Sequence, residues 1–257
     1  MLRVPRLCDH LIMLKNISAN RQFMKNLEIK YLDFGFAEYK ETWDRQEGLL
    51  KGIVDLKRAN SNLPEDQKIQ TPNWLILVEH LHVYTLGKSG DEKNLLLNYI
   101  QLQAKDSAFF RTDRGGDITY HGPGQIVGYP IIDLENFGIG LRQYICSIEE
   151  AIIRAVAEYG IEAGRDPKAT GVWIDVGKPS ARKICAIGVK SSRFVTMHGF
   201  ALNVNTDLEY FKHINPCGFT DKAVTSIEKE LGEKQDFEKA KAIVLTKLSE
   251  LFGATIV

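Results

Sequence analysis

A cysteine in a predicted turn is the first residue of this sequence that could do covalent chemistry. Cys217 lies in Asn215-Pro216-Cys217-Gly218, where proline and glycine favour an exposed turn over a strand interior. A cysteine in a turn is most often incidental, and it becomes a nucleophile only where a neighbouring group favours the thiolate. Spacing alone does not choose among the side chains that could do this, which are His121, Lys183, His198 and His213.

The other cysteines point to packing rather than to chemistry. Cys146 falls in an apolar helix pattern and Cys185 in the strand-like run 184–187, so we expect both to be core thiols. The cysteines show no CxxC spacing, and the six histidines form no HExxH or similar cluster. We therefore expect no metal site. So low a cysteine content favours a reducing compartment over a disulfide scaffold.

The segment 114–125, Arg-Gly-Gly-Asp-Ile-Thr-Tyr-His-Gly-Pro-Gly-Gln, is the densest unusual run in the chain. It holds more glycine than a hairpin needs, and glycine lets a backbone lie directly against a ligand. A plainer interpretation is two turns around a short strand, with Arg114 and His121 in solvent.

Neither of the common nucleotide motifs fits this sequence. Gly87-Lys88-Ser89 resembles the end of a phosphate-binding loop, but the first glycine of that motif would fall on His82. No GxGxxG opens a helix after a strand. We therefore expect Gly87 to be part of a structural turn, and no cofactor to be bound.

Composition narrows the class of protein. The 257 residues balance 33 Lys+Arg against 33 Asp+Glu, whereas a sequence-independent nucleic-acid binder carries a basic surplus. No apolar run approaches the ~18 residues of a membrane span. Residues 1–23 lack the sustained apolar region of a signal peptide. We expect a cytoplasmic monomer that binds neither nucleic acid nor membranes.

The hydrophobic pattern predicts the elements that position these residues. Strands are expected at 27–34, 74–78, 83–86, 171–175, 183–190 and 194–204, with glycine-punctuated strands between 108 and 134. Helices are expected at 35–57, 91–97, 140–159 and from Asp236 as N-cap to Gly253, the first with an apolar face that begins at Phe36. Strands and helices cluster rather than alternate, which predicts an α+β fold, a mixed β-sheet flanked by helices.

Two segments stand apart from this pattern. The polar stretch 58–72 is expected to be a surface loop, too short to link two domains. Residues 1–23 are expected to be a loosely attached N-terminal extension. We expect residues 24–257 to form a single domain.

Six segments, in the same order, resemble the lipoyl(octanoyl) transferase family. They are RGGDITYHGPGQIVGYPIIDL (114–134), GVW (171–173), RKICAIGVK (182–190), MHGFALNVNTDL (197–208), INPCG (214–218) and TSIEKELG (225–232). The resemblance covers residues 27–252, and six motifs in order make chance agreement implausible. Residues 1–23 and the 58–72 stretch look like additions that touch no motif.

The resemblance implies a fold like that of biotin and lipoate protein ligases, and a covalent mechanism with a cysteine and a lysine. Motif by motif, the nucleophile falls on Cys217 and the lysine on Lys183 rather than Lys190. The residues implied to contact the acyl chain are Arg114, Gly115, Gly116, Asp117, Ile118, Thr119, Tyr120, His121, Ala186, Ile187, Gly188, Gly199, Phe200 and Ala201.

The implied reaction moves an octanoyl group from octanoyl-acyl carrier protein to a lysine of a lipoyl domain. The implied acceptors are the lipoyl domains of 2-oxoacid dehydrogenases and the glycine cleavage H protein. Exchange of one thioester for another changes the free energy little, so the reaction needs no ATP. Lys183 would stabilise the thiolate and later accept a proton from the incoming amine. Backbone N–H groups near residues 183–188 or beside Cys217 are candidates for holding the oxyanion.

Three alternatives remain open on the sequence alone. An ATP-dependent lipoate or biotin ligase of the same fold would need an adenylate pocket and no catalytic cysteine. A non-catalytic binder of carrier proteins would be expected to lack Cys217 or Lys183. An amidotransferase that moves octanoyl between two lipoyl-domain proteins differs only in its donor.

Overall fold

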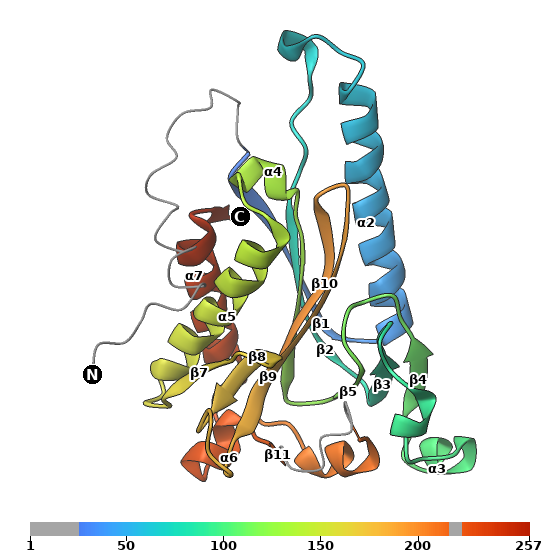
Figure 1. The fold of residues 1–257 in the computed structure, drawn as a ribbon, viewed down its shortest axis with the longest axis vertical. Coiled ribbons are helices and arrows are strands. Elements are labelled where there is room, and N and C mark those ends of the chain that lie inside the picture. The colour runs from blue at the N-terminus through green and yellow to red at the C-terminus, as the bar shows by residue number, and fades with distance from the viewer. Residues whose placement is uncertain (1–25, 216–222) are drawn as a thin grey trace.

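The computed structural model describes residues 26–215 and 223–257 of the chain. Within these residues nine strands form one mixed sheet. They are β1 (Glu28–Ala37), β2 (Trp74–His80), β6 (Gln125–Ile131), β7 (Ala163–Asp166), β8 (Ala169–Ile174), β9 (Arg182–Ser192), β10 (Val195–Asn203), β11 (Ala223–Val224) and β12 (Thr255–Ile256). Their order across the sheet is β12-β1-β2-β6-β10-β9-β8-β7, and β11 pairs with β9 (Figure 1).

A smaller sheet holds the glycine-rich segment. Its strands, in the spatial order β4-β3-β5, are β3 (Val83–Leu86), β4 (Ala108–Arg111) and β5 (Ile118–His121). The segment 112–117 connects β4 to β5, so the small sheet determines where Arg114 and its glycines lie. Beside it are the short α3 (Tyr99–Gln103) and the 3-10 helix η4 (Leu208–His213).

Helices cover both faces of the large sheet. Alternate residues of β2 enter two different hydrophobic clusters, because successive side chains of a strand point to opposite faces. Leu75 and Leu77 pack with the antiparallel helices α5 (Leu141–Ala157) and α7 (Phe237–Phe252). Ile76 packs on the other face with α2 (Tyr39–Asn60), the long helix on the right of Figure 1. The result is three layers, and the predicted mixed sheet flanked by helices is confirmed.

The start of the first helix differs from the prediction. The periodicity placed Phe36 on a helix, but Phe36 lies in β1, pairs with Glu79 and is 53% exposed. Gly35 has a φ of +54°, and the register shifts there while pairing to β2 continues to Ala37. Ladder hydrogen bonds with β2 therefore extend the strand, and the helix begins at Tyr39.

The helix expected at 91–97 is also wrong. Asp91 accepts a hydrogen bond from the backbone of Lys93 and caps a single 3-10 turn, η3 (Glu92–Asn94). A helix forms only after it, at α3, where Asn98 and Gln101 make a reciprocal capping box. Other short elements escaped prediction: η2 (Glu65–Gln67), α4 (Leu134–Phe137) and α6 (Ile227–Leu231).

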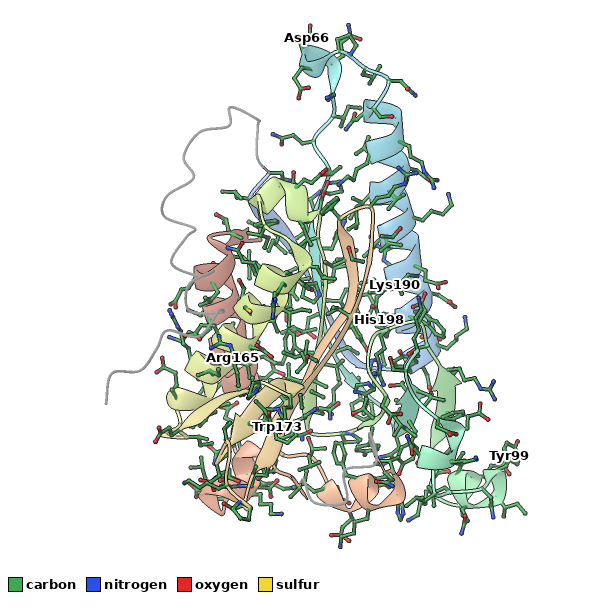
Figure 2. All side chains as sticks on the ribbon, in the orientation of Figure 1. Asp66, Tyr99, Arg165, Trp173, Lys190 and His198 are labelled. Atoms are coloured by element: carbon green, nitrogen blue, oxygen red, sulfur yellow. The ribbon has the colours of Figure 1, made fainter. Side chains whose placement is uncertain are left out.

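The ends of the last helix lie where the sequence predicted them, whereas the polar loop begins after Asn60 and not at residue 58, because α2 continues that far. Asp236 accepts the backbone N–H of Lys239 at 3.0 Å, and Gly253 ends α7 in the left-handed conformation. The loop after α2 carries Asp66 at the top of Figure 2. None of the helices in the described part of the chain combines the length and apolar character needed to cross a bilayer.

Candidate active site

A cavity of about 510 Å³ opens where the glycine-rich segment meets β9 and β10. All but one of the residues implied to contact an acyl chain line it. These lining residues are Arg114, Gly115, Gly116, Asp117, Ile118, Thr119, His121, Ala186, Ile187, Gly188, Gly199, Phe200 and Ala201. The sequence motifs therefore converge on one space, although they come from two sheets.

Tyr120 is the exception. Because side chains alternate along β5, Tyr120 points away from the side that Thr119 and His121 present to the cavity. Its hydroxyl lies 2.6 Å from His82 Nδ1, and its ring stacks on Tyr210 with centroids 4.9 Å apart. Tyr120 therefore belongs to the core of the small sheet and does not line the cavity.

The turn at Gly87 holds the glycine-rich segment in place. The backbone N–H groups of residues 87, 88 and 89 donate to the carbonyls of Asp117, Arg114 and Gly116 at 2.9–3.2 Å. A Cβ on Gly87 would lie 2.4 Å from the Gly116 carbonyl oxygen, so no side chain fits there. The expected structural turn is present, and its function is to brace the cavity wall.

Arg114 is buried, which excludes the interpretation that it is solvated. Its guanidinium donates to the Thr85 carbonyl at 2.7 Å, to Thr85 Oγ1 at 3.0 Å and to the Gly115 carbonyl at 3.1 Å. Asp117 accepts from Asn94 Nδ2 at 2.8 Å and from the Ile118 backbone at 2.7 Å. These two charged residues therefore also shape the wall that they line.

Two of the candidate histidines are buried against the cavity. His121 contacts Gln125 at 2.8 Å, and burial lowers its pKa to about 3. His198 contacts Asp113 at 2.9 Å, and burial lowers its pKa to about 4 although the carboxylate opposes the shift. Both rings are therefore neutral at pH 7 and cannot stabilise a thiolate by charge. His213, on η4, is half-buried, and this burial is the main cause that lowers its pKa.

The two lysines of β9 lie in different surroundings. Lys190 is ion-paired with Asp113, beside His198 (Figure 2). Lys183 lines the cavity, and its Nζ lies 4.6 Å from the centroid of the Trp173 ring. The structure thus places the Lys183 side chain at the cavity, whereas Lys190 is paired outside it.

Cys217 lies outside the described residues, but both flanks of its segment are described. Phe211 and Ile214 line the cavity from one side, and Ala223 and Val224 line it from the other. Cys146 and Cys185 are both buried. Cys185 is a free thiol, as expected, but Cys146 is disulfide-bonded, so the expectation of a core thiol is wrong there. Burial also raises the pKa of the Cys185 thiol, which makes it a poor nucleophile.

Further residues line the same cavity without having been predicted. They are Tyr39, Gln125, Val127, Tyr129, Leu141, Ile145, Lys168, Ala169, Thr170, Trp173, Val189 and Asn203, with the flanks named above. Gln125 and Trp173 fall in the quoted motifs, so their position in the sequence was the available signal. Tyr39 carries no such signal, and its contact with the His121 ring depends on how α2 packs.

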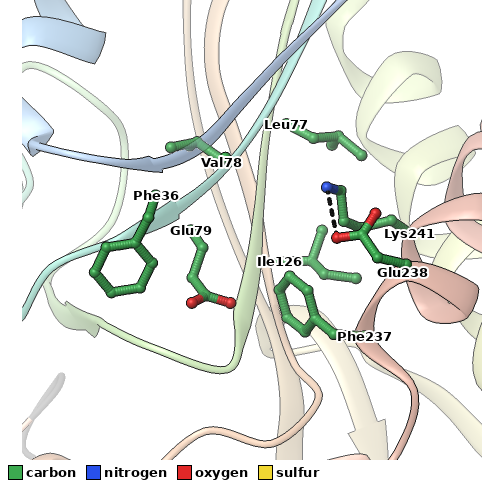
Figure 3. A pocket seen from close by; sticks show the side chains of 9 residues that line it. Phe36, Leu77, Val78, Glu79, Ile126, Phe237, Glu238 and Lys241 are labelled. Atoms are coloured by element: carbon green, nitrogen blue, oxygen red, sulfur yellow. Dashed lines mark hydrogen bonds and ion pairs between the residues drawn. The ribbon is translucent and has the colours of Figure 1, made fainter.

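A second, smaller cavity of about 180 Å³ lies between the end of β2 and the start of α7. Figure 3 shows Phe36, Glu79 and Phe237 around it, with Lys241 bonded to Glu238. None of the predicted site residues lines it. The larger cavity is therefore the candidate active site.

The sequence matches known proteins over most of its length. Residues 40–249 match the lipoyl protein ligase A/B catalytic domain family. An octanoyltransferase of Flavobacterium johnsoniae is 57% identical over 233 residues, 90% of this chain and 100% of the relative. An octanoyltransferase of Christiangramia forsetii is 54% identical over 232 residues, 90% of this chain and 98% of that protein. The chain belongs to the octanoyltransferase family. It is therefore an enzyme of the acyltransferase class.

Solved structures agree with this fold. A bipartite lipoate protein ligase from Thermoplasma acidophilum superposes with a TM-score of 0.63 at 13% identity, covering 90% of this chain and 86% of that chain. A lipoate-protein ligase A bound with ATP gives a TM-score of 0.60 at 14% identity, covering 91% and 88%. At such low identity these structures establish the fold, and the predicted ligase-like architecture is confirmed.

Proposed function

We propose that this protein transfers an octanoyl group from octanoyl-acyl carrier protein to a lysine of lipoyl domains, through a thioester on Cys217. The acceptors are the lipoyl domains of 2-oxoacid dehydrogenases and the glycine cleavage H protein, and the reaction takes place in the cytoplasm. The observation that supports this most is the cavity, which Lys183 lines together with both flanks of the Cys217 segment.

In the first half-reaction the Cys217 thiolate attacks the carbonyl carbon of the octanoyl thioester. The new C–S bond forms as the bond to the carrier thiol breaks, so one thioester replaces another. Free cysteine has a pKa of about 8.5, and a nearby Lys183 ammonium stabilises the thiolate. The same ammonium can give its proton to the departing carrier thiolate, which leaves Lys183 neutral.

In the second half-reaction the amine of the acceptor lysine attacks the thioester on Cys217. The C–N bond forms, the Cys217 thiolate leaves, and the amine loses a proton. Neutral Lys183 can accept that proton as a general base, which restores the starting charges of both residues. One lysine therefore serves both steps without a cofactor.

The cavity walls suit an acyl chain because their glycines let neighbouring backbone segments approach closely. A Cβ on Gly188 would lie 2.8 Å from the Gly115 carbonyl oxygen, and one on Gly199 would lie 2.1 Å from the Gly128 carbonyl oxygen. Ile187 supplies apolar surface. Burial of an eight-carbon chain, at ~0.8 kcal/mol per methylene, contributes roughly 5 kcal/mol of binding.

Intact-mass spectrometry tests the proposed intermediate. Mixing the protein with octanoyl-acyl carrier protein should add one octanoyl group to Cys217, in a bond that hydroxylamine cleaves. Cys217→Ala should carry no adduct. An adduct on Cys146 or Cys185 that survives in Cys217→Ala would overturn the assignment.

Cofactor and donor dependence separate the proposal from its rivals. Transfer should run at full rate without ATP and in the presence of EDTA, whereas a ligase requires ATP and magnesium. Octanoyl-acyl carrier protein should be a better donor than an octanoylated lipoyl domain. The reverse preference would identify an amidotransferase.

A further inference from the structure

The motif Gly171-Val172-Trp173 has no part in the steps above, although two of its residues surround Lys183. We propose that Gly171, Trp173 and Glu149 form a seat that holds the Lys183 side chain, as an ammonium, toward the cavity. They are positioning residues that act through Lys183. What the seat does for catalysis depends on the function proposed above, but the seat itself is a claim about geometry.

The indole ring of Trp173 is the surface over which the Lys183 ammonium lies. Lys183 Nζ lies 4.6 Å from the ring centroid, within the range of a cation–π contact. Trp173 is only 4% exposed, and its Nε1 donates to the Ala169 carbonyl at 2.9 Å, which fixes the plane of the ring. A buried and oriented indole attracts an ammonium more strongly than an exposed one, because water competes less.

Gly171 provides room for the lysine stem. Its φ is +125°, and an added Cβ would lie 2.5 Å from the Cys185 carbonyl oxygen and 3.4 Å from Lys183 Cε. The methylene chain of Lys183 therefore passes over a position that has no side chain. Any larger residue would both strain the backbone and separate β8 from β9.

Glu149 supports the seat from α5. Its carboxylate accepts the Gly171 N–H at 3.0 Å and lies 3.2 Å from Arg165 Nε. Burial raises the pKa of Glu149, while the Gly171 N–H and the charges of Arg165 and Lys183 lower it. Figure 2 shows Arg165 and Trp173 in the lower part of the molecule, below Lys190. The carboxylate thus fixes the Gly171 backbone and adds negative charge on this side.

Strand pairing and a hydrogen bond also fix the backbone of Lys183. Val224 of β11 pairs with Lys183, and the Thr225 N–H donates to the Lys183 carbonyl at 2.9 Å. Other charged groups facing this region include Arg165 on β7 and Lys168 in the turn after it, both of which oppose a second cation. The indole and the Glu149 carboxylate offset that repulsion around the Lys183 ammonium, which the first half-reaction uses.

Nuclear magnetic resonance of ¹³C-methylated lysines tests the seat without any turnover. Ring current from Trp173 should move the Lys183 signal upfield, with Lys183→Arg used for assignment. Trp173→Leu should abolish the shift. Trp74→Leu is the matched control, because Lys30 Nζ lies 5.2 Å from the Trp74 ring on another strand. An unshifted Lys183 signal in the unaltered protein would overturn the proposal.

Alkylation of Cys217 by iodoacetamide, followed against pH, tests what the seat does. Trp173→Leu should slow alkylation at pH 7 by roughly 5- to 30-fold, the scale of a cation–π contact shielded from water. Trp173→Phe keeps an aromatic face, so its alkylation rate should fall much less. This variant also provides a test if the leucine variant does not fold. The double variant Trp173→Leu/Lys183→Met should react no more slowly than Lys183→Met alone.

The two hypotheses fail in different ways. If Lys183→Met alkylates at the normal rate, the cysteine–lysine pair of the proposed function is wrong, whatever the resonance experiment shows. If Lys183→Met is slow but folded Trp173→Leu and Trp173→Phe both react normally, the pair stands and the seat is wrong.

Discussion

At the scale of single residues, the surroundings of a lysine determine what it can do. Lys190 is ion-paired with Asp113, whose carboxylate is shared with His198. Lys183 lies over an indole beside a cavity. Two lysines of the same strand therefore differ in their access to a reacting group.

Replacement of each lysine by arginine separates charge from proton transfer. Arginine keeps the positive charge but does not deprotonate in proteins. Lys183→Arg should reduce both half-reactions by roughly 10²–10⁴, the usual contribution of general acid–base catalysis, because arginine can neither give a proton to the carrier thiolate nor accept one from the amine. Lys190→Arg should retain near-normal rates, because an arginine can still pair with Asp113. Single-turnover acylation and delivery to a lipoyl domain measure both, and a loss at Lys190 or His213 instead would contradict the assignment.

At the scale of elements, the cavity depends on a turn that is remote from it in sequence. Residues 87–89 follow β3 and donate three backbone hydrogen bonds to the segment before β5. That segment carries no regular hydrogen-bond ladder of its own, so the turn supplies its support.

Gly87→Ala should disturb this support. Its new Cβ would press on the Gly116 carbonyl, and such overpacking typically costs ~1–3 kcal/mol. We expect a lower free energy of unfolding in urea and a larger KM for the acyl donor. Gly48→Ala on α2, where no atom lies within 4 Å of the added Cβ, should be neutral or stabilising by up to ~1 kcal/mol. Equal effects of both variants would show that the turn does not support the cavity.

The sequence predicted the long elements well because their patterns repeat over many residues. The strand expected at 83–86 coincides with β3, and Asp236 caps α7 as expected. Short pieces such as β11 and β12 exist only because a distant strand pairs with them, and no local pattern indicates this. The motifs placed Ala186 and Gly188 at the cavity, whereas Trp173 gained a role only once the distance to Lys183 was known.

At the scale of the whole molecule, three buried histidines make stability depend on pH. Burial lowers the pKa of His121 to about 3 and of His80 and His198 to about 4. The unfolded chain binds these protons near pH 6.5, so below that pH it holds more protons than the native state. Stability that is fully present above pH 6.5 is therefore lost as the pH falls toward 4.

The free energy of unfolding should fall by about 1.4 kcal/mol per pH unit for each histidine in this window. Urea unfolding between pH 7 and pH 5 measures the slope before most carboxylates titrate. His80→Gln keeps a hydrogen-bond partner for the Tyr129 hydroxyl. It should reduce the slope of unfolding free energy against pH by the contribution of one histidine. A stability that stays constant over this range would contradict the burial of neutral rings.

Residues 1–23 lie outside the predicted domain and outside every motif. Deleting them should leave kcat/KM within a few-fold and the unfolding midpoint nearly unchanged. Loss of activity from a folded truncated protein would assign residues 1–23 to the catalytic unit.

The pairing of β12 with β1 has a consequence for how the protein is made. Glu28 lies opposite Thr255, and the Val257 N–H donates to the Ile29 carbonyl at 3.0 Å. During synthesis the strand at residue 28 leaves the ribosome long before the strand at residue 255 exists. The outer edge of β1 therefore remains unpaired for almost the whole of translation. During that time it can form strand pairs with other nascent chains. Chaperone dependence during synthesis should thus exceed what the folded protein's own stability suggests.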